Sequence, residues 1–268
     1  MHHHLLQNKD RFQRRAITIF DQNITDLNGD NTNPSASSSV LFLIGEPRAL
    51  NGTPCLILNK RSRQVRQPGD LCFPGGGPAP RIDAALARLL SLPGSPLSRW
   101  RSKTECHPPQ KVRRLAQLLA TCLRESFEEM RLIPLYVRFL GPLPPQRLIM
   151  FNRIIYPMVG WVTCQKHFRL NGEVEKLVPV PIHALLNPDN YASFRLTYPS
   201  DLPPGINTKR REFPCFVHLQ EGTTEILWGA TYRIVMTFLA QIFDFTPPET
   251  IDLPRIDNHM SPDYFKNV

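Results

Sequence analysis

Short apolar runs along the chain predict strands, and one long apolar segment near the C-terminus predicts a helix. Residues 40–44 (VLFLI) and 55–59 (CLILN) have strand length, and a loop containing Gly and Pro separates them, so we expect two paired strands. Residues 71–73 and 158–162 predict two further strands. The apolar segment 230–243 predicts a final helix that packs on the core.

Residues 115–130 (LAQLLATCLRESFEEM) predict the clearest helix, with a broad apolar face. On its other side Glu125, Glu128 and Glu129 stand at positions i, i+3 and i+4, so their carboxylates share one face. Such a face is stable if it is solvated or if a cation lies there, and Mg²⁺ and Mn²⁺ prefer oxygen ligands. Arg124, four residues before Glu128, is placed to hold a carboxylate. The helix alone favours a solvated acidic patch over a metal site.

Polar and proline-rich stretches divide the chain into regions. Residues 1–39 predict an N-terminal extension, with a short basic helix over 7–20 followed by a flexible linker. Residues 40–250 form the expected domain, and residues 251–268 form a tail. A basic, Pro-rich insertion at about 84–114 predicts an exposed and partly disordered loop, with an anion or nucleic-acid contact as the alternative.

Composition limits the classes of protein that fit. Hydrophobic residues make up 41% of the chain and charged residues 21%, as in soluble globular proteins. The net charge of +9 favours anionic partners such as phosphorylated metabolites or nucleic acid. The six cysteines form no CxxC pair, which argues against structural zinc and favours a reducing compartment. No apolar run is long enough for a membrane span, so we expect a cytoplasmic protein with no membrane partner.

A larger pattern connects the glycine-rich turn to the acidic helix. Phe-Pro-Gly-Gly-Gly at 73–77, an acid at Asp83, and Arg-Glu-Ser-Phe-Glu-Glu at 124–129 together resemble the Nudix box. Five residues separate Gly77 from Asp83, which stands where the family has its first acid. The family's Arg-Glu-x-x-Glu-Glu core matches residues 124–129 position by position.

The flanking segments resemble the coenzyme A diphosphatase branch of that family. The similar segments are LILNKRS at 56–62, GDLCFPGG at 69–76, LGPLPP at 140–145, EVEK at 173–176 and WGAT at 228–231. Three features depart from the pattern. Gln67 replaces a His, and the insertion separates Asp83 from the acidic helix. Arg131 replaces the glycine that follows the box, which suggests a different helix exit.

The resemblance implies a fold and an activity. The fold would be an α/β Nudix-type α/β/α sandwich with a mixed β-sheet and a catalytic loop-helix-loop. The activity would be metal-dependent hydrolysis of coenzyme A or acyl-coenzyme A to 3′,5′-ADP and (acyl-)4′-phosphopantetheine. One alternative is another nucleoside diphosphate conjugate, such as ADP-ribose, NADH or a dinucleoside polyphosphate. Another is a non-catalytic Nudix scaffold that binds anionic ligands or nucleic acid.

The resemblance also assigns roles on the acidic helix. Glu125, Glu128 and Glu129 would bind Mg²⁺ or Mn²⁺, with Glu128 at the centre of the chemistry and Arg124 orienting the carboxylates. Glu175, or in its place Glu173, would supply the general base or another ligand from a loop.

The remaining roles concern the substrate, a small nucleotide diphosphate. Gly76 and Gly77 would shape the loop around the helix. Arg61 and Arg66 would contact phosphates, by their charge and their position before the loop, and an exposed solubilising arginine is the alternative for each. Whether the protein forms a homodimer is left open.

Overall fold

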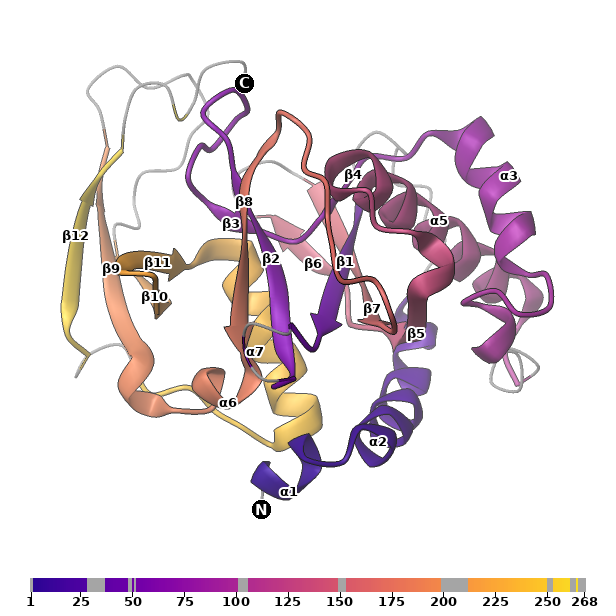
Figure 1. Cartoon of the computed structure of the whole chain (residues 1–268), viewed down its shortest axis with the longest axis horizontal. Helices are drawn as coiled ribbons and strands as arrows, with labels where there is room; N and C mark the ends of the chain where they lie inside the picture. Colours follow the sequence, from indigo (N-terminus) through magenta and orange to yellow (C-terminus); the bar gives the residue numbers. More distant parts are fainter. Residues whose placement is uncertain are drawn as a thin grey trace.

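The computed structural model describes residues 2–27, 37–47, 50, 52–100, 106–148, 153–198, 212–249, 253–260 and 264. Within these residues the fold is α/β, with two mixed β-sheets and helices packed around the larger one (Figure 1). The predicted mixed α/β class is confirmed. No helix in this part of the chain is both long and apolar enough to cross a membrane.

The larger sheet is built around β1 (Ser37–Gly45), which is buried along its whole length. It pairs in parallel with β7 (Arg153–Val162) and antiparallel with β2 (Cys55–Arg61). The strand order is β3-β2-β1-β7-β5, with β3 at Leu71–Cys72 and β5 at Val137–Pro142. Three further strands pair with this path: β4 (Gly75–Gly76) with β1, β6 (Gln146–Leu148) with β7, and β8 (Val174–Pro181) with β2.

A smaller sheet lies at the opposite side of the molecule from α3 (Pro80–Leu90) and α5 (Pro109–Met130) (Figure 1). Its order is β11 (Thr223–Leu227), β10 (Glu212–Gln220), β9 (Tyr191–Thr197) and β12 (Arg255–His259). Glu225 of β11 is only 2% exposed and lies 3.1 Å from Lys60 Nζ and 2.8 Å from Lys176 Nζ. This buried carboxylate therefore ties the smaller sheet to β2 and β8 of the larger one.

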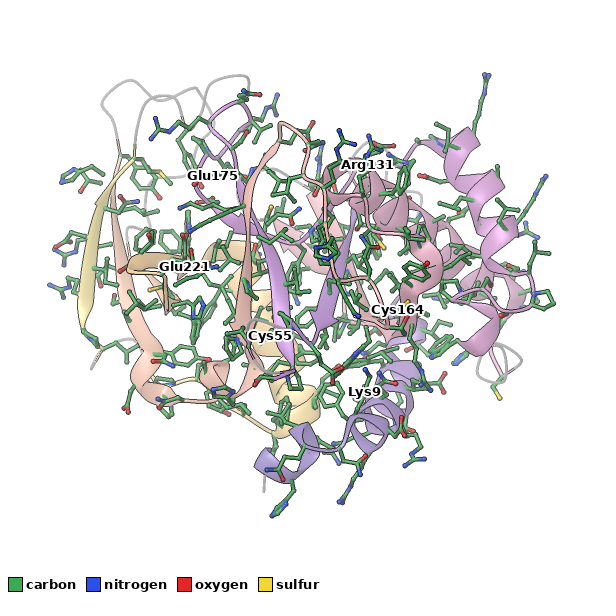
Figure 2. All side chains as sticks on the ribbon, in the orientation of Figure 1. Lys9, Cys55, Arg131, Cys164, Glu175 and Glu221 are labelled. Atoms are coloured by element: carbon green, nitrogen blue, oxygen red, sulfur yellow. The ribbon has the colours of Figure 1, made fainter. Side chains whose placement is uncertain are left out.

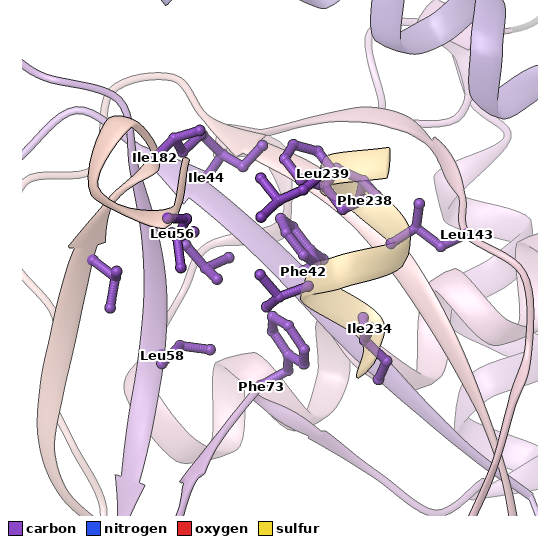
Figure 3. Packing of buried hydrophobic residues seen from close by; sticks show 14 of the residues in the cluster. Phe42, Ile44, Leu56, Leu58, Phe73, Leu143, Ile182, Ile234, Phe238 and Leu239 are labelled. Carbon is purple, nitrogen blue, oxygen red and sulfur yellow. The ribbon is translucent and has the colours of Figure 1, made fainter. Parts of the chain in front are cut away.

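The alternation of side chains along β1 creates a core on each face of the larger sheet. Phe42 faces α7 (Gly229–Phe243), with its ring 4.4 Å from that of Phe238 and 5.0 Å from that of Phe73 (Figure 3). Leu41 and Leu43 pack in the other core, with the apolar face of α5 (Pro109–Met130). The sheet is thus sandwiched between helices, as the sequence predicts.

The remaining elements are helices, and two of them, α3 and η4, fall wholly or partly in the insertion. They are α1 (His2–Leu6), α2 (Lys9–Asp21), η1 (Gln22–Asp26), α3 (Pro80–Leu90), η4 (Ser98–Trp100), η5 (Pro134–Tyr136), α6 (Ile182–Leu185) and η6 (Pro188–Asn190).

The predicted elements 40–44, 55–59, 71–73 and 158–162 fall on β1, β2, β3 and β7, and 230–243 falls on α7. The acidic helix begins earlier than its predicted start at 115. It starts at Pro109. Proline is tolerated in the first turn of a helix, because the N–H that it lacks would have no acceptor inside the helix.

Much of the insertion at about 84–114 is packed in the domain, so the expectation of an exposed, partly disordered loop is wrong for α3, Leu97 and Trp100. Residues 91–94 are exposed, as expected. α3 packs against α5, and Leu90, Leu97 and Trp100 are buried in the core on that side of the sheet. The Trp100 ring meets the Phe139 ring edge-on at 5.3 Å. These apolar residues outweigh the basic character of the segment, and residues 101–105 lie outside the described part.

The predicted helix over 7–20 is present as α2 (Lys9–Asp21), and it contributes to the core, where the sequence predicts an extension outside the domain. In α2, Phe12, Ala16 and Phe20 are each at most 1% exposed. The Phe12 ring lies 5.5 Å from the Trp161 ring of β7. Residues 28–36 of the expected linker lie outside the described residues, and β1 begins at Ser37.

This packing makes the N-terminal helix necessary for stability. Phe12→Ala should lower the free energy of unfolding by about 3 to 5 kcal/mol, because it opens a cavity in a filled core. Urea denaturation measures the change. Leu219→Ala, at a side chain that is 70% exposed, is the control and should cost under about 0.5 kcal/mol. Equal, small effects of both changes would contradict a structural role for α2.

Candidate active site

The glycine-rich turn lies between the central strand and the acidic helix. Gly75 pairs with Val40 of β1 and has φ +150°, and a Cβ there would stand 2.4 Å from Ser39 O. A Cβ on Gly76 would stand 2.6 Å from the Glu125 carboxylate. Gly75 therefore requires glycine, because a side chain there would collide with the backbone of β1. At Gly76 a side chain would displace the Glu125 carboxylate from its place beside the turn. Gly77 contributes instead its carbonyl, which accepts from Arg124 Nη2 at 2.9 Å.

Among the acids of α5, Glu129 has the most strongly shifted pKa. Its Oε2 accepts from Asn59 Nδ2 at 2.6 Å, and its Oε1 accepts from Gly75 N at 3.4 Å. Burial, with smaller effects from the charges of Glu125 and Glu173, raises the pKa of Glu129 to about 8, against the lowering effect of these hydrogen bonds. Burial also raises the pKa of Glu125. These carboxylates therefore lie within electrostatic reach of one another in a partly desolvated place.

Arg124 links the three parts of the box. Its Nη2 lies 3.0 Å from Glu125 Oε1, and its Nη1 lies 3.2 Å from Glu128 Oε1. Its Nε donates to Asp83 Oδ1 at 2.8 Å. Arg124 thus holds two acids of the helix and is itself held by a third acid from outside it, as the predicted orienting role requires.

Asp83 meets the acidic helix despite the insertion between them. It lies in the first turn of α3 and is 3% exposed. Its Oδ2 accepts from Thr121 Oγ1 and from Ala79 N, both at 2.7 Å. The insertion leaves and returns through the packed pair α3 and α5, so it leaves the contact intact. The carboxylate of Asp83 is engaged in positioning Arg124.

The two candidate acids at the start of β8, Glu173 just before the strand and Glu175 within it, lie in different surroundings. Asn171 N donates to Glu129 O at 2.8 Å, and Ser62 N donates to Glu173 O at 2.9 Å, so this loop runs along the end of α5. The charge of Glu173 contributes to the raised pKa of both Glu125 and Glu129. Glu175 is 45% exposed and lies 3.7 Å from Lys60 Nζ. In Figure 2 it lies toward the smaller sheet, away from Arg131 at the end of α5.

The C-terminal end of α5 does not take the unusual form that its lack of a glycine suggests. The replacement of glycine by Arg131 suggests a different exit, but Arg131 adopts the left-handed conformation, with φ 55° and ψ 35°. Its N–H donates to Phe127 O at 3.0 Å, and its guanidinium lies 5.0 Å from the Phe127 ring. The chain therefore leaves the helix through a left-handed cap even without glycine, at a conformational cost that this stacking offsets.

A cavity of about 440 Å³ opens beside the glycine turn, on the α7 side of the larger sheet. Its wall includes the three arginines Arg61, Arg153 and Arg233, together with the apolar rings of Phe73, Phe213 and Trp228. Asp70 also lines it and accepts from Trp228 Nε1 at 3.1 Å. Arg66 is exposed and absent from the described lining, and its carbonyl accepts from Arg61 Nε at 2.6 Å. Of the two predicted phosphate contacts, the structure brings Arg61 to the cavity.

The acids of the box have the chemistry of a divalent cation site. Carboxylate oxygens are the donors that Mg²⁺ and Mn²⁺ prefer, and a cation would relieve the repulsion that helps to raise the pKa of Glu129. Among the described residues, no three or more His, Cys, Asp or Glu side chains lie close enough together to bind one metal ion. The carboxylates of α5 are thus the right type of ligand for Mg²⁺ or Mn²⁺, whereas their side chains are not gathered around a single point.

Several residues of this site escape prediction from the sequence. Asn59 ends an apolar strand and gives no signal of its contact with Glu129. Gly75 stands out only as one of three glycines, and its pairing with Val40 depends on strand register. Arg153 and Arg233 lie far from the box in sequence. The 228–231 signature did carry a signal, because Trp228 to Thr231 all line the cavity.

Comparison with known proteins agrees with this arrangement. No family model matches the chain. The chain is 27% identical over 202 residues to a protein of Pectobacterium atrosepticum described as "Uncharacterized Nudix hydrolase NudL", with 74% of this chain and 80% of that protein covered. Sequence similarity and the arrangement of the box together support a Nudix hydrolase enzyme.

Solved structures of Nudix hydrolases overlap with part of the chain. A Nudix hydrolase from Alicyclobacillus acidocaldarius has 18% identity and a TM-score of 0.37, covering 58% of this chain and 82% of its own. RenU, a Nudix hydrolase from M. smegmatis, has 12% identity and a TM-score of 0.36, covering 56% and 73%. Both TM-scores are below 0.5, so the class of protein rests on the sequence similarity and the box.

The raised pKa of Glu129 predicts a pH-dependent stability. The folded protein holds this proton more tightly than the unfolded chain, so its stability should fall as pH rises from about 4.5 to about 8. In metal-free buffer, Glu129→Gln should reduce this fall, raising the melting temperature relative to wild type by a few degrees near pH 8.5 and little at pH 5. Melting curves at both pH values measure it. The exposed Glu221→Gln is the control, and a parallel fall in Glu129→Gln and wild type would refute the assignment.

Proposed function

We propose that this protein is a metal-dependent diphosphatase that cleaves the diphosphate linkage of coenzyme A or acyl-coenzyme A. The observation that carries the proposal is the acidic face of α5, organised by Arg124 and set against the Gly76 turn. Beside this turn lies a cavity of about 440 Å³, within the size range of small-molecule sites. The products would be 3′,5′-ADP and (acyl-)4′-phosphopantetheine.

The acids of α5 would hold the metal. Glu125, Glu128 and Glu129 would bind Mg²⁺ or Mn²⁺, which when bound supplies charge neutralisation at the diphosphate oxygens and a more acidic water. Arg124 keeps the carboxylates of Glu125 and Glu128 in place, and Asn59 does the same for Glu129. Arg61, in the cavity wall, would contact a phosphoryl oxygen.

A general base must accept the proton of the attacking water. Glu173 and Glu175 are the two acids considered for this role. The electrostatic coupling of Glu173 to Glu125 and Glu129 supports Glu173. The nearness of Glu175 to Lys60 Nζ, at 3.7 Å, favours an ion pair for Glu175 instead.

The choice of coenzyme A rests on the sequence segments that resemble that branch and on their position. Residues from two of them, Gly75, Gly76 and Trp228 to Thr231, line the same cavity. Its apolar rings offer contact to a base or to an aliphatic chain, and its arginines offer contact to phosphates.

A second candidate is another nucleoside diphosphate conjugate, such as ADP-ribose or NADH. Gln67 supports this second candidate, because it lines the cavity at the position where the coenzyme A diphosphatase branch has a His. The third candidate, a non-catalytic scaffold that binds nucleic acid through the insertion, loses support, because much of the insertion is packed against α5 and the sheet.

Hydrolysis assays test the proposal directly. Coenzyme A, acyl-coenzyme A, ADP-ribose, NADH and dinucleoside polyphosphates should be compared with Mg²⁺ or Mn²⁺ present. We expect metal-dependent cleavage of coenzyme A. Glu128→Gln should reduce the rate about 100-fold or more, because it removes the charge of a carboxylate that would bind the metal and so weakens stabilisation of the transition state. Glu221→Gln, at an exposed acid of the turn between β10 and β11, should keep wild-type rates.

Each outcome of that panel has a distinct meaning. Cleavage of another compound but not of coenzyme A would refute the substrate and retain the class of reaction. Absence of cleavage from folded, metal-supplied protein across the whole panel would refute the proposed activity.

The base assignment has its own test. Glu173→Gln should lower kcat by about 100-fold, because proton abstraction contributes roughly 10² to 10⁴ in rate. Glu175→Gln, two residues along the chain at the start of β8, is the matched control and should change kcat less than about threefold. The reverse result would assign the base to Glu175.

A further inference from the structure

The cavity beside the glycine turn carries more positive charge than a diphosphate needs. Arg61, Arg153 and Arg233 line it, and Asp70 is the one acid of the described lining. The carboxylate of Asp70 is occupied by Trp228 and by the Tyr264 hydroxyl. A diphosphate diester carries one negative charge on each phosphoryl group, and the site proposed on α5 would supply a divalent cation for it. The arginines therefore suit a further anion.

Two of these arginines are held at one place in the wall. Arg153 begins β7 and its Nη1 donates to Ser38 Oγ at 3.4 Å. Arg233, in α7, donates from Nη2 to Arg147 O at 2.7 Å. Arg147 belongs to β6, where its neighbour Leu148 is paired with Arg153. Arg233 is thus anchored one residue along the ladder from the partner of Arg153, and both arginines line the same cavity.

The start of α7 adds hydrogen-bond donors to this part of the wall. Gly229, Ala230 and Thr231 of its first turn line the cavity. The helix has 15 residues and its N-cap, Trp228, makes no side-chain capping hydrogen bond to it. The N–H groups of a first helical turn have no acceptor within the helix and favour an anion. The first turn of α7 and the two arginines thus line one cavity.

We propose that Arg153 and Arg233, with the first turn of α7, form a subsite for a phosphate monoester. A phosphate monoester carries close to two negative charges at neutral pH and has three acceptor oxygens, which matches two guanidinium groups and backbone N–H donors. The inference rests on the proposed function for the diphosphate that the same ligand places at the acidic helix. It adds that the enzyme selects conjugates with a phosphate ester on the nucleoside over those without one.

Binding of two product-like nucleotides tests the subsite without any need for catalysis. 3′,5′-ADP and 5′-AMP differ only in the 3′-phosphate, and calorimetry measures the dissociation constant of each. We expect 3′,5′-ADP to bind at least about tenfold more tightly, as one or two charge-assisted hydrogen bonds provide. Arg153→Gln and Arg233→Gln should each reduce this ratio, and the double variant should bring it near one. Arg88→Gln, on the exposed side of α3, is the control and should leave the ratio unchanged.

Equal affinities in the wild-type protein, or a ratio that survives the double variant, would overturn the subsite. Circular dichroism checks that each variant is folded. If the double variant is not, Arg153→Gln alone decides, because this side chain is exposed at the start of its strand.

Hydrolysis separates this inference from the proposed function. Glu128→Gln should lose activity and keep the binding ratio. A wild-type protein that binds 3′,5′-ADP preferentially but cleaves no diphosphate would refute the function and retain the subsite. Cleavage of coenzyme A and 3′-dephospho-coenzyme A with equal kcat/KM, together with equal binding of the two nucleotides, would refute the subsite and retain the function.

Discussion

The guanidinium of Arg124 is the interaction on which the candidate site depends. It joins the insertion helix through Asp83, the glycine turn through the Gly77 carbonyl, and the acids of its own helix. Burial lowers the pKa of Arg124, but the hydrogen bond to Asp83 and the charges of Glu125 and Asp83 outweigh it and raise that pKa above its usual range. A permanent positive charge at this point compensates three acids that would otherwise repel one another.

The two sheets give this charged centre its surroundings. The larger sheet carries the acidic helix on one face and α7 on the other, and the glycine turn at Gly75 and Gly76 meets both the acidic helix and the cavity. The smaller sheet supplies Phe213 to the cavity wall, and its strand β11 leads into Trp228 at the start of α7. Glu225 binds Lys60, the residue between Asn59 and Arg61. The smaller sheet therefore supports the strand that carries one contact to Glu129 and one to the cavity.

Local pattern was sufficient for the elements whose burial repeats along the chain. The strand over 40–44 and the acidic face at Glu125, Glu128 and Glu129 follow directly from apolar runs and helical spacing. The pattern could not give the burial of Phe12 or Trp100, because each is a single ring within a polar or basic segment. It also could not place Arg233 in the same cavity wall as Arg153, since that placement depends on how α7 crosses the sheet.

The return of Asp83 to Arg124 through α3 and α5 has a consequence for how this box is encoded. Its two halves are joined by a helical pair rather than by a fixed number of residues. The spacing between them is therefore free to vary as long as the ends of the detour stay packed. A linear consensus with constant spacing describes such a motif poorly, because the motif requires only the geometry at which the chain re-enters the helix.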